Sequence, residues 1–341
     1  MRKPTPQQVL LNELKGMWKS YAIQAAAHYN FATLIGEGSK SAAELAQATG
    51  TQELWVHRVL RLLASLGIFC EVSPRTYANT ELSACLRDGV PGSLRAMARM
   101  MGSERYRLEW GLLEESMRTG MSAIALLHGR DLYEYLDEHP QERDVFDQAL
   151  SGFSAIVDDA IARTYDFSSV KKVIDLGGGR GSLLAAIRAR FPELQCTLFE
   201  RSFVIENLHQ AGGISRLDGS LDRSIDLVVG DFFAGVPGGA DAYLLKEVLH
   251  NWSDEQCITV LKHCRRAMHP DAVILVCEQV ISPANNEGDF AKGLDLLMGL
   301  EQQGCERTEE EFRALYEAAG LRLARAIPTP SPHWILEGVP A

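Results

Sequence analysis

The chain has 341 residues, with 34 Lys and Arg against 45 Asp and Glu, so its formal net charge is -11 at neutral pH. Nucleic-acid phosphates and anionic lipid repel that charge, which argues against nucleic-acid and membrane-surface partners. The apolar share of 46% suits a globular core, and the length suits one large domain or two. Seven cysteines without a Cys-x-x-Cys pair, no apolar leader and no bilayer-length apolar run predict a soluble cytoplasmic protein.

The first part of the chain, up to about residue 163, is predicted to be almost wholly helical. Its earliest segment carries a wide apolar surface that must pack against another surface, and a partner subunit is a good candidate. The apolar residues of this segment are Val9, Leu10, Leu14, Met17, Trp18, Tyr21, Ile23 and Ala25.

A pair of closely spaced helices follows. Ser41 and Glu44 have the spacing of a capping box, and Gly50 ends the helix that they begin. Thr51 is expected to cap the second helix, whose apolar face runs up to Gly67. Two helices joined in this way are typical of a helix-turn-helix.

A hairpin is predicted next, over residues 68–72 and 76–78, and together with the two helices it makes a winged helix. That shape raises the possibility of DNA binding by a ligand-sensing regulator. The second helix offers only His57, Arg58 and Arg61, whereas a DNA-binding domain usually shows a clear basic stripe. We therefore expect this winged helix to serve dimerisation.

Residues 93–121 are rich in methionine and aromatic side chains. Methionine at helical spacing usually fills a core, but it also lines adaptable pockets for flat ligands, and both interpretations stay open. Two further helices are predicted, one around residues 131–136 and one from about Pro140 to Tyr165.

From about residue 166 the pattern changes to strands that alternate with helices, which predicts a doubly wound α/β sheet. We expect three parts: a winged-helix domain over residues 1–100, a helical linker that contributes to a substrate pocket over 101–165, and the α/β domain over 166–341. The predicted strands cover residues 173–174, 195–200, 225–229, 241–245, 272–278, 321–327 and 333–337.

A glycine-rich loop follows the first of these strands, and a helix begins after it. Its glycines are Gly177, Gly179 and Gly181, with Ser182 where a dinucleotide-binding fingerprint needs its third glycine. Asp175 precedes the loop, and an acid is unfavourable beside a pyrophosphate. The loop therefore favours a positively charged ligand without phosphate, such as S-adenosylmethionine.

Three later strand ends support that ligand. Glu200 ends the second strand, where a carboxylate accepts hydrogen bonds from two ribose hydroxyls. Asp231 and Phe232 follow the third, offering an acceptor for an adenine amino group and an aromatic face for its ring. Lys246 follows the fourth. The carboxyl ends of parallel strands share one edge of the sheet, so these residues should lie together.

His250 is the candidate for the reacting group. Ser253 and Gln256 form a capping box, which places His250 in the turn between the fourth strand and the next helix. A phenol titrates near pH ~10, so its attack on a methyl group benefits from a base with a pKa near ~6.5. Other histidines of the chain are taken as structural: His28, His57, His139, His209 and His263.

A histidine base needs a partner that orients it. Glu278 is predicted to end the fifth strand, beside the fourth, and so to lie close to His250. Glu306 precedes a helix capped by Thr308, with Glu311 completing its capping box. Acids near helix starts are also favoured by the helix dipole alone, so a purely structural role stays open for Glu306.

With these motifs the chain resembles the class I S-adenosylmethionine-dependent O-methyltransferases of small molecules. The resemblance is to the group with plant caffeate and flavonoid, animal hydroxyindole, and bacterial phenazine and anthracycline enzymes, and it covers nearly the whole chain. It implies a Rossmann-like seven-stranded C-terminal sheet and an N-terminal, mostly helical winged-helix dimerisation domain. The matching positions are Trp110, Gly129, Tyr135, Pro140, Phe146, and residues 175–181, 230–233, 249–252 and 306–308.

The resemblance also implies roles for individual residues, an intertwined homodimer, and a reaction without a metal ion. His250 would be the general base, flanked by Glu278 and Glu306. The cofactor S-adenosylmethionine would be held by Asp175, Gly177, Gly179, Glu200, Arg201, Gly230, Asp231, Phe232, Lys246 and Ser154. The substrate would be bordered by Trp110, Phe153, Asn251, Met298 and Asp295.

The chain departs from the family pattern at three places, the last of which lies beside the expected acceptor pocket. Asn251 stands where the family usually has Asp, Leu150 where many relatives have Met, and Gln302-Gln303 where Gly-Gly is common. The resemblance predicts O-methylation of an aromatic or heteroaromatic secondary metabolite, as in antibiotic biosynthesis. Alternatives within the family are N-methylation and S-adenosylmethionine-dependent hydroxylation or decarboxylation.

Overall fold

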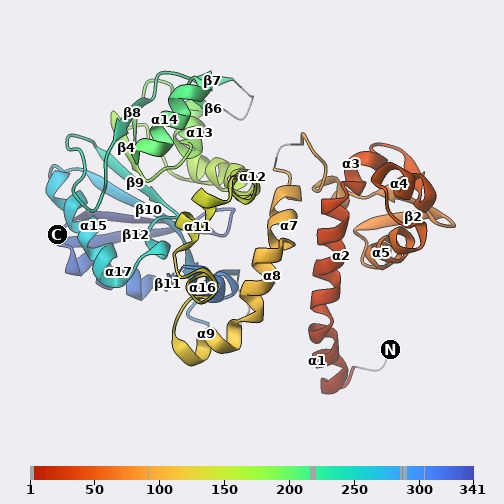
Figure 1. Ribbon diagram of the computed structural model, residues 1–341. Helices are drawn as coiled ribbons and strands as arrows, with labels where there is room; N and C mark the ends of the chain where they lie inside the picture. The colour runs from red at the N-terminus through yellow and green to blue at the C-terminus, as the bar shows by residue number, and fades with distance from the viewer. Residues whose placement is uncertain (1–3, 91, 216–219, 285, 287–289, 303) are drawn as a thin grey trace. The chain divides into compact units, whose positions relative to one another are not determined.

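The computed structural model describes residues 4–90, 92–215, 220–284, 286, 290–302 and 304–341 (Figure 1). The chain forms two compact units, one of Met1–Gly111 with Leu136–Phe153 and one of Leu112–Tyr135 with Ser154–Ala341. Within the described ranges, no helix has both the length and the apolar character that crossing a membrane requires.

The first unit is a helical domain with a small sheet. Strand β1 pairs with β3, and β3 pairs with β2, all antiparallel, so the predicted hairpin gains a third strand. Its elements are α1 (Pro6–Leu14), α2 (Gly16–His28), α3 (Phe31–Ile35), β1 (Ser39–Ser41), α4 (Ala42–Thr49), α5 (Glu53–Ser65), β2 (Phe69–Ser73), β3 (Thr76–Asn79), α6 (Glu81–Ala84), α7 (Arg95–Met101) and α8 (Glu104–Gly111).

Local signals largely set the ends of the two winged-helix helices. The capping box of Ser41 and Glu44 is present, and Gly50 ends α4 in the left-handed conformation. The prediction that Thr51 caps α5 is wrong: Gln52 is the capping position and makes no side-chain cap bond. The Thr51 hydroxyl instead lies 2.9 Å from the hydroxyl of Thr49.

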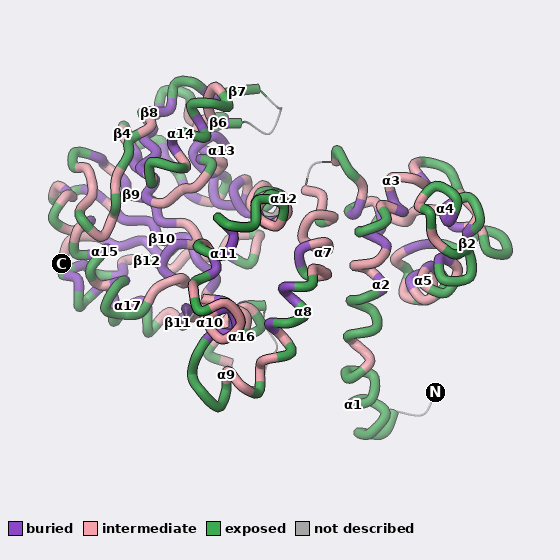
Figure 2. The backbone as a smooth tube through the Cα atoms, in the orientation of Figure 1, coloured by how far each residue is buried: buried purple, intermediate pink, exposed green. Residues whose placement is uncertain are grey.

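Helices α1 and α2 present apolar side chains to solvent within this unit. No residue of α1 is buried, and the exposed fraction of Leu14 is 65% and that of Trp18 58% (Figure 2). Large apolar residues exposed in a row are typical of an interaction surface. The exposed set is Val9, Leu10, Leu11, Leu14, Met17, Trp18 and Tyr21.

The second unit is built on a mixed sheet with the order β12-β13-β10-β9-β4-β5-β8. The five strands from β10 to β8 run parallel, and β13 is antiparallel to both β10 and β12. The strands are β4 (Lys172–Leu176), β5 (Gln195–Glu200), β8 (Asp226–Val229), β9 (Ala242–Lys246), β10 (Val273–Ile281), β12 (Leu321–Pro328) and β13 (His333–Pro340), with the short β6 (Ile214–Ser215), β7 (Leu221–Asp222) and β11 (Arg307–Thr308).

These strands confirm the seven predicted from the sequence and the Rossmann-like class. Two bounds differ in a way that matters for the site. Asp175 lies within β4, and Glu278 lies inside β10 and not at its end. The strand continues to Ile281 because its last two residues pair with β11, at Arg307 and Thr308.

Helices flank the sheet, and one hydrophobic cluster joins β4, β9 and β10 to α15 and α17. The central strands β9 and β10 are buried on both faces, so they read as continuous apolar runs (Figure 2). The remaining helices are α9 (Leu113–Thr119), α10 (Ala123–His128), α11 (Leu132–Glu138), α12 (Pro140–Thr164), α13 (Ser182–Arg190), α14 (Ser202–Ala211), the 3-10 turn η1 (Leu249–Asn251), α15 (Asp254–Ala267), α16 (Phe290–Glu301) and α17 (Glu309–Ala318).

The Tyr316 ring of α17 lies so close to β13 that Gly338 leaves no room for a side chain. A Cβ added there would lie 2.0 Å from Cε1 of Tyr316 and 2.7 Å from Cγ2 of Ile274. We expect Gly338→Ala to lower the free energy of unfolding by about 1–3 kcal/mol, the usual cost of an overpacked core. Gly299→Ala is the matched control, because nothing lies within 4 Å of a Cβ there. Thermal unfolding measures the stability of both variants. An equal loss of stability in Gly338→Ala and Gly299→Ala would contradict this packing.

Candidate active site

The glycine-rich loop joins β4 to α13 at the carboxyl edge of the sheet. Gly177, Gly179 and Gly181 all have positive φ, at 71°, 55° and 75°, which a residue with a Cβ adopts only with strain. A Cβ on Gly178 would lie 2.2 Å from Oδ2 of Asp175. The loop therefore needs its glycines both for backbone conformation and for close approach to an acid.

Asp175 is a fully buried carboxyl beneath that loop. Among the described residues, no hydrogen-bond partner reaches either of its oxygens. Burial raises the pKa of Asp175 to about 7, although the positive charge of Lys246 opposes the rise. A buried carboxyl without a donor is costly, and a ligand that brings positive charge or donors lowers that cost.

Glu200 ends β5 and is tied to the loop. Its Oε2 accepts from the backbone N–H of Gly179 at 3.2 Å, and its Oε1 accepts from that of Arg201 at 2.8 Å. The Arg201 side chain is itself mostly exposed. These bonds fix the carboxylate of Glu200 next to the loop and leave it lone pairs for a ligand's hydroxyl groups.

The segment after β8 brings an aromatic ring to the same place. A Cβ on Gly177 would lie 3.1 Å from Cε1 of Phe232, so the ring lies directly against the loop. Asp231 accepts from the backbone N–H of Phe233 at 2.8 Å. Gly230 is required next to Phe199, because a Cβ there would lie 2.1 Å from the ring.

Lys246 is the last residue of β9 and is nearly buried. Its Nζ donates to Oδ1 of Asp158 at 2.7 Å and to Oγ of Ser154 at 3.0 Å, both on α12. Burial lowers the pKa of Lys246, but the charges of Asp158 and Glu247 outweigh that effect and the pKa is raised. The sequence reasoning missed Asp158, because an acid within a long helix carries no local signal of a partner 88 residues away.

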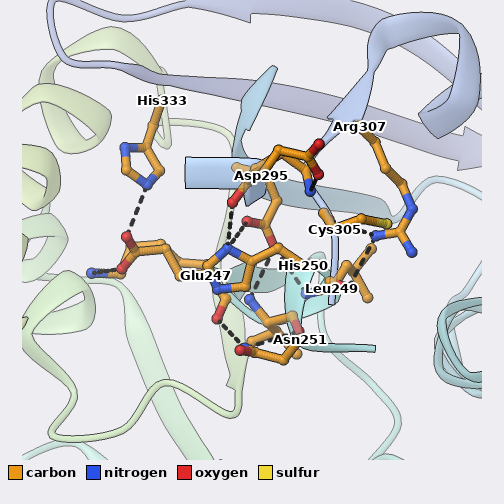
Figure 3. Close-up of polar contacts among 12 residues, drawn as sticks. Glu247, Leu249, His250, Asn251, Asp295, Cys305, Arg307 and His333 are labelled. Atoms are coloured by element: carbon orange, nitrogen blue, oxygen red, sulfur yellow. Dashed lines mark hydrogen bonds and ion pairs between the residues drawn. The ribbon is translucent and has the colours of Figure 1, made fainter. Parts of the chain in front are cut away.

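His250 lies in η1, the turn after β9 (Figure 3), and its imidazole faces two buried glutamates. Its Nδ1 is 2.9 Å from Oε1 of Glu306 and 3.7 Å from Oε2 of Glu278. Burial lowers the pKa of His250, but the charge of Glu278 and the hydrogen bond and charge of Glu306 outweigh it and raise the pKa to about 9.

Glu278 is held from the backbone of the same turn. Its Oε1 accepts the N–H groups of Val248 at 2.9 Å and Leu249 at 2.8 Å. Burial raises the pKa of Glu278. The donor atoms of His250, Glu278 and Glu306 lie within 4.8 Å of one another, a spacing that could also hold a metal ion. In the structure Nδ1 of the imidazole bonds directly to a carboxylate oxygen of Glu306.

A second histidine–glutamate pair lies beside the first, and the sequence reasoning did not find it. Nε2 of the buried His333 is 3.1 Å from Oε1 of Glu247, whose backbone has a positive φ of 53°. Burial raises the pKa of Glu247, but the hydrogen bond from His333 and the charge of Lys246 outweigh it and hold the pKa at about 2. A strained non-glycine backbone is itself a signal of function, but it is visible only in the structure.

Three of the predicted substrate residues, Asn251, Asp295 and Met298, lie in the second unit. Asn251 donates to the backbone carbonyls of Glu247 at 3.1 Å and Val248 at 3.3 Å, so its amide stabilises the His250 turn. Asp295, on α16, accepts the backbone N–H of Glu306 at 2.9 Å (Figure 3), and Met298 is buried on the same helix.

Other predicted positions bear less on this geometry. Trp110 belongs to the first unit, on α8, where its ring contacts Tyr106. The side chain of Phe153 and residue Gln303 lie outside the described part of the chain. Leu150 is an exposed residue of α12.

The isolated carboxyl of Asp175 predicts a pH dependence of stability. The unfolded carboxyl ionises near 3.8 and the folded one near 7, so between these values the folded state keeps a proton that the unfolded state loses. The free energy of unfolding therefore falls as pH rises through that window. We expect Asp175→Asn to flatten the melting temperature against pH there and to raise it at pH 8.

Asp271→Asn, which changes an exposed acid of the same unit, is the control and should leave the slope unchanged. If the melting temperature of Asp175→Asn fell with pH as steeply as that of the wild type, Asp175 would not be the group with the raised pKa.

Comparisons with known proteins agree with this geometry. Residues 11–88 match the sequence model of the O-methyltransferase dimerisation domain, and residues 88–322 match that of the O-methyltransferase domain. The chain is 38% identical to a phenazine O-methyltransferase of Lysobacter antibioticus, over 97% of this chain and 96% of that one. It is 37% identical to a mitomycin biosynthesis 6-O-methyltransferase of Streptomyces lavendulae, over 92% and 89%. The SAH-bound crystal structure of CalO1, a methyltransferase in calicheamicin biosynthesis, has a TM-score of 0.87 at 32% identity, covering 99% and 100%.

Proposed function

The chain belongs to the O-methyltransferase family, and from that membership we propose that it methylates a hydroxyl group of an aromatic or heteroaromatic secondary metabolite, with S-adenosylmethionine as the methyl donor. The observation that carries this proposal is the buried imidazole of His250 between Glu278 and Glu306. It lies at the same sheet edge as the glycine-rich loop, where parallel α/β sheets bind their ligands.

The residues of the loop fit S-adenosylmethionine. Bound S-adenosylmethionine would supply an electrophilic methyl group on a positively charged sulfur. Glu200, with lone pairs left on both oxygens, would accept from ribose hydroxyls, and Asp231 with Phe232 would take the adenine. The carboxyl of Asp175, which has no hydrogen-bond partner among the described residues, supports a cationic ligand above the loop. Gly179, Gly230, Arg201, Lys246 and Ser154 complete the proposed set.

His250 would act as the general base. Nδ1 is hydrogen-bonded to Oε1 of Glu306, with Oε2 of Glu278 3.7 Å away, which leaves Nε2 to accept the proton of the acceptor hydroxyl. The raised pKa means that the imidazole is mostly protonated in the protein alone. A cationic ligand bound close by disfavours the imidazolium, so the pKa falls when the site is filled. Asn251, Asp295, Met298, Trp110 and Phe153 remain the proposed border of the acceptor.

We propose that the protein is a homodimer built through its N-terminal domain. A dimerisation domain matches residues 11–88, and the apolar row on α1 and α2 supplies a surface that requires cover. A winged helix that serves dimerisation needs no basic stripe, which accounts for its modest basic content. We therefore propose no nucleic-acid partner. All seven cysteines are described and free, which supports a cytoplasmic location.

Removal of the base should separate binding from turnover. We expect His250→Ala to lower the rate of methyl transfer roughly 10²- to 10⁴-fold, the usual contribution of a general base. The affinity for S-adenosylmethionine should stay close to that of the wild type. The assay follows methyl-labelled donor with a panel of hydroxylated aromatics and their amino analogues.

The control is His209→Ala, which changes an exposed histidine on α14. Wild-type turnover of hydroxyl acceptors by His250→Ala would exclude the proposed base. Turnover of amino acceptors alone would favour N-methylation, because an amine with a free lone pair needs no base.

A charge on the apolar row should dissociate the dimer. We expect Trp18→Glu to shift the protein from dimer to monomer in sedimentation, because a buried interface does not tolerate an unpaired charge. Val72→Asp is the control, since Val72 is equally apolar and exposed but lies on β2. A monomeric wild type, or a dimer that only Val72→Asp disrupts, would contradict an interface on α1 and α2.

A further inference from the structure

Arg307 follows Glu306, and its side chain is almost completely buried. We propose that Arg307 is a positioning residue, whose guanidinium holds the His250 turn (residues 248–252) against the Glu306 segment (residues 304–307) and so sets the separation of His250 and Glu306. The inference rests on the proposed role of His250 as the general base.

The guanidinium donates hydrogen bonds to backbone carbonyls that precede and follow His250 in the chain. Nη1 donates to the backbone carbonyl of Leu249 at 3.1 Å, and Nη2 donates to that of Trp252 at 2.8 Å (Figure 3 shows the contact with Leu249). The side chain of Arg307 is only 3% exposed. Two carbonyls at the start and the end of the turn therefore depend on one buried cation.

The same guanidinium reaches the start of the next helix. Nε donates to Oδ1 of Asp254 at 2.9 Å, and Nη2 donates to the same oxygen at 2.8 Å. Asp254 is the first residue of α15 and is 66% exposed. Arg307 thus joins three elements: η1, α15 and β11, the strand in which it lies. A lysine has a single point of charge and cannot reproduce this planar set of donors.

Backbone contacts show how closely the two segments fit. The backbone N–H of Cys305 donates to the carbonyl of His250 at 3.0 Å. A Cβ on Gly304 would lie 2.0 Å from that same carbonyl oxygen. The carbonyl of His250 is therefore bonded to the Glu306 segment as well. Arg307 donates to the carbonyls of Leu249 and Trp252, which lie on either side of it in the chain.

The consequence concerns the 2.9 Å contact between Nδ1 of His250 and Oε1 of Glu306. That contact joins a side chain of the turn to a side chain of the segment, so it persists only while the two backbones stay in register. The acidic groups that act on His250 are Glu278, Glu306 and Glu247. Glu278 is bonded to the turn itself, so loss of the Arg307 contacts should weaken the Glu306 contact selectively.

The test uses Arg307→Lys and Asp254→Asn. For both variants we expect kcat to fall while the KM for S-adenosylmethionine stays within about twofold of the wild-type value. In Arg307→Lys the fall in kcat should be roughly tenfold to a hundredfold, since a displacement of about 1 Å costs up to ~10² in rate. The fall should be smaller in Asp254→Asn. The titration midpoint of His250, followed by NMR of nitrogen-labelled histidine, should move down towards ~6.5, the value of a free imidazole.

Matched controls are Glu255→Gln and Arg313→Lys. Glu255 is the next residue of α15 and bonds to Ser253, and Arg313 pairs with Glu309 on α17. Both controls should keep the wild-type kcat and His250 midpoint. If Arg307→Lys fails to fold, Asp254→Asn carries the test, because its side chain is mostly exposed.

An unchanged kcat and midpoint in folded Arg307→Lys, or in Asp254→Asn where the former does not fold, would overturn the proposal. A lower melting temperature with an unchanged midpoint would show a structural role alone and would also overturn it. If no acceptor is methylated by the wild type, the proposed function fails, whereas a shifted His250 midpoint in the variants would still support the positioning role.

Discussion

The hydrogen bond between His250 and Glu306 requires two ionisable side chains to be buried together, with Glu278 as a third. Such groups are costly to remove from water unless their charges and hydrogen bonds are matched. Here two carboxylates face one imidazole, and Glu278 also accepts two backbone N–H groups. The extended β10, the turn after β9 and the segment that leads into β11 meet at this point. Arg307 adds the cation that keeps them together.

The cofactor side of the site follows a different principle. Its acid, Asp175, is buried beneath a loop of glycines and meets no hydrogen-bond donor in the part of the chain that the structure describes. Burial of this carboxyl lowers the stability of the protein, and a bound ligand would offset that cost. Glu200 is bonded by the loop and is ready to accept hydroxyl groups. The two halves of the site therefore differ: His250, Glu278 and Glu306 bond to one another or to the backbone, whereas the carboxyl of Asp175 has no hydrogen-bond partner among the described residues. A cationic methyl donor would supply the missing partner of Asp175. Its positive charge would also lower the raised pKa of His250.

Membership of the O-methyltransferase family explains why both units are present in one chain. The winged helix has the shape of a DNA-binding module, yet its apolar surface lies on α1 and α2 and its basic content is small. The second histidine–glutamate pair, His333 with Glu247, has no counterpart in the sequence reasoning.

The sequence by itself determined the order and type of the main elements. Buried parallel strands such as β9 are continuous apolar runs, and capping boxes such as those at Ser253 and Thr308 are local patterns, so both are legible in the chain. The glycine-rich loop and the turn that holds His250 are also marked by local patterns of the sequence. Only the tertiary structure decided that Glu278 lies inside a strand that β11 prolongs. It alone also decided that Lys246 pairs with Asp158 and that Arg307 reaches the His250 turn. These contacts join residues tens of positions apart, and no local propensity specifies which distant partner a buried charge will meet.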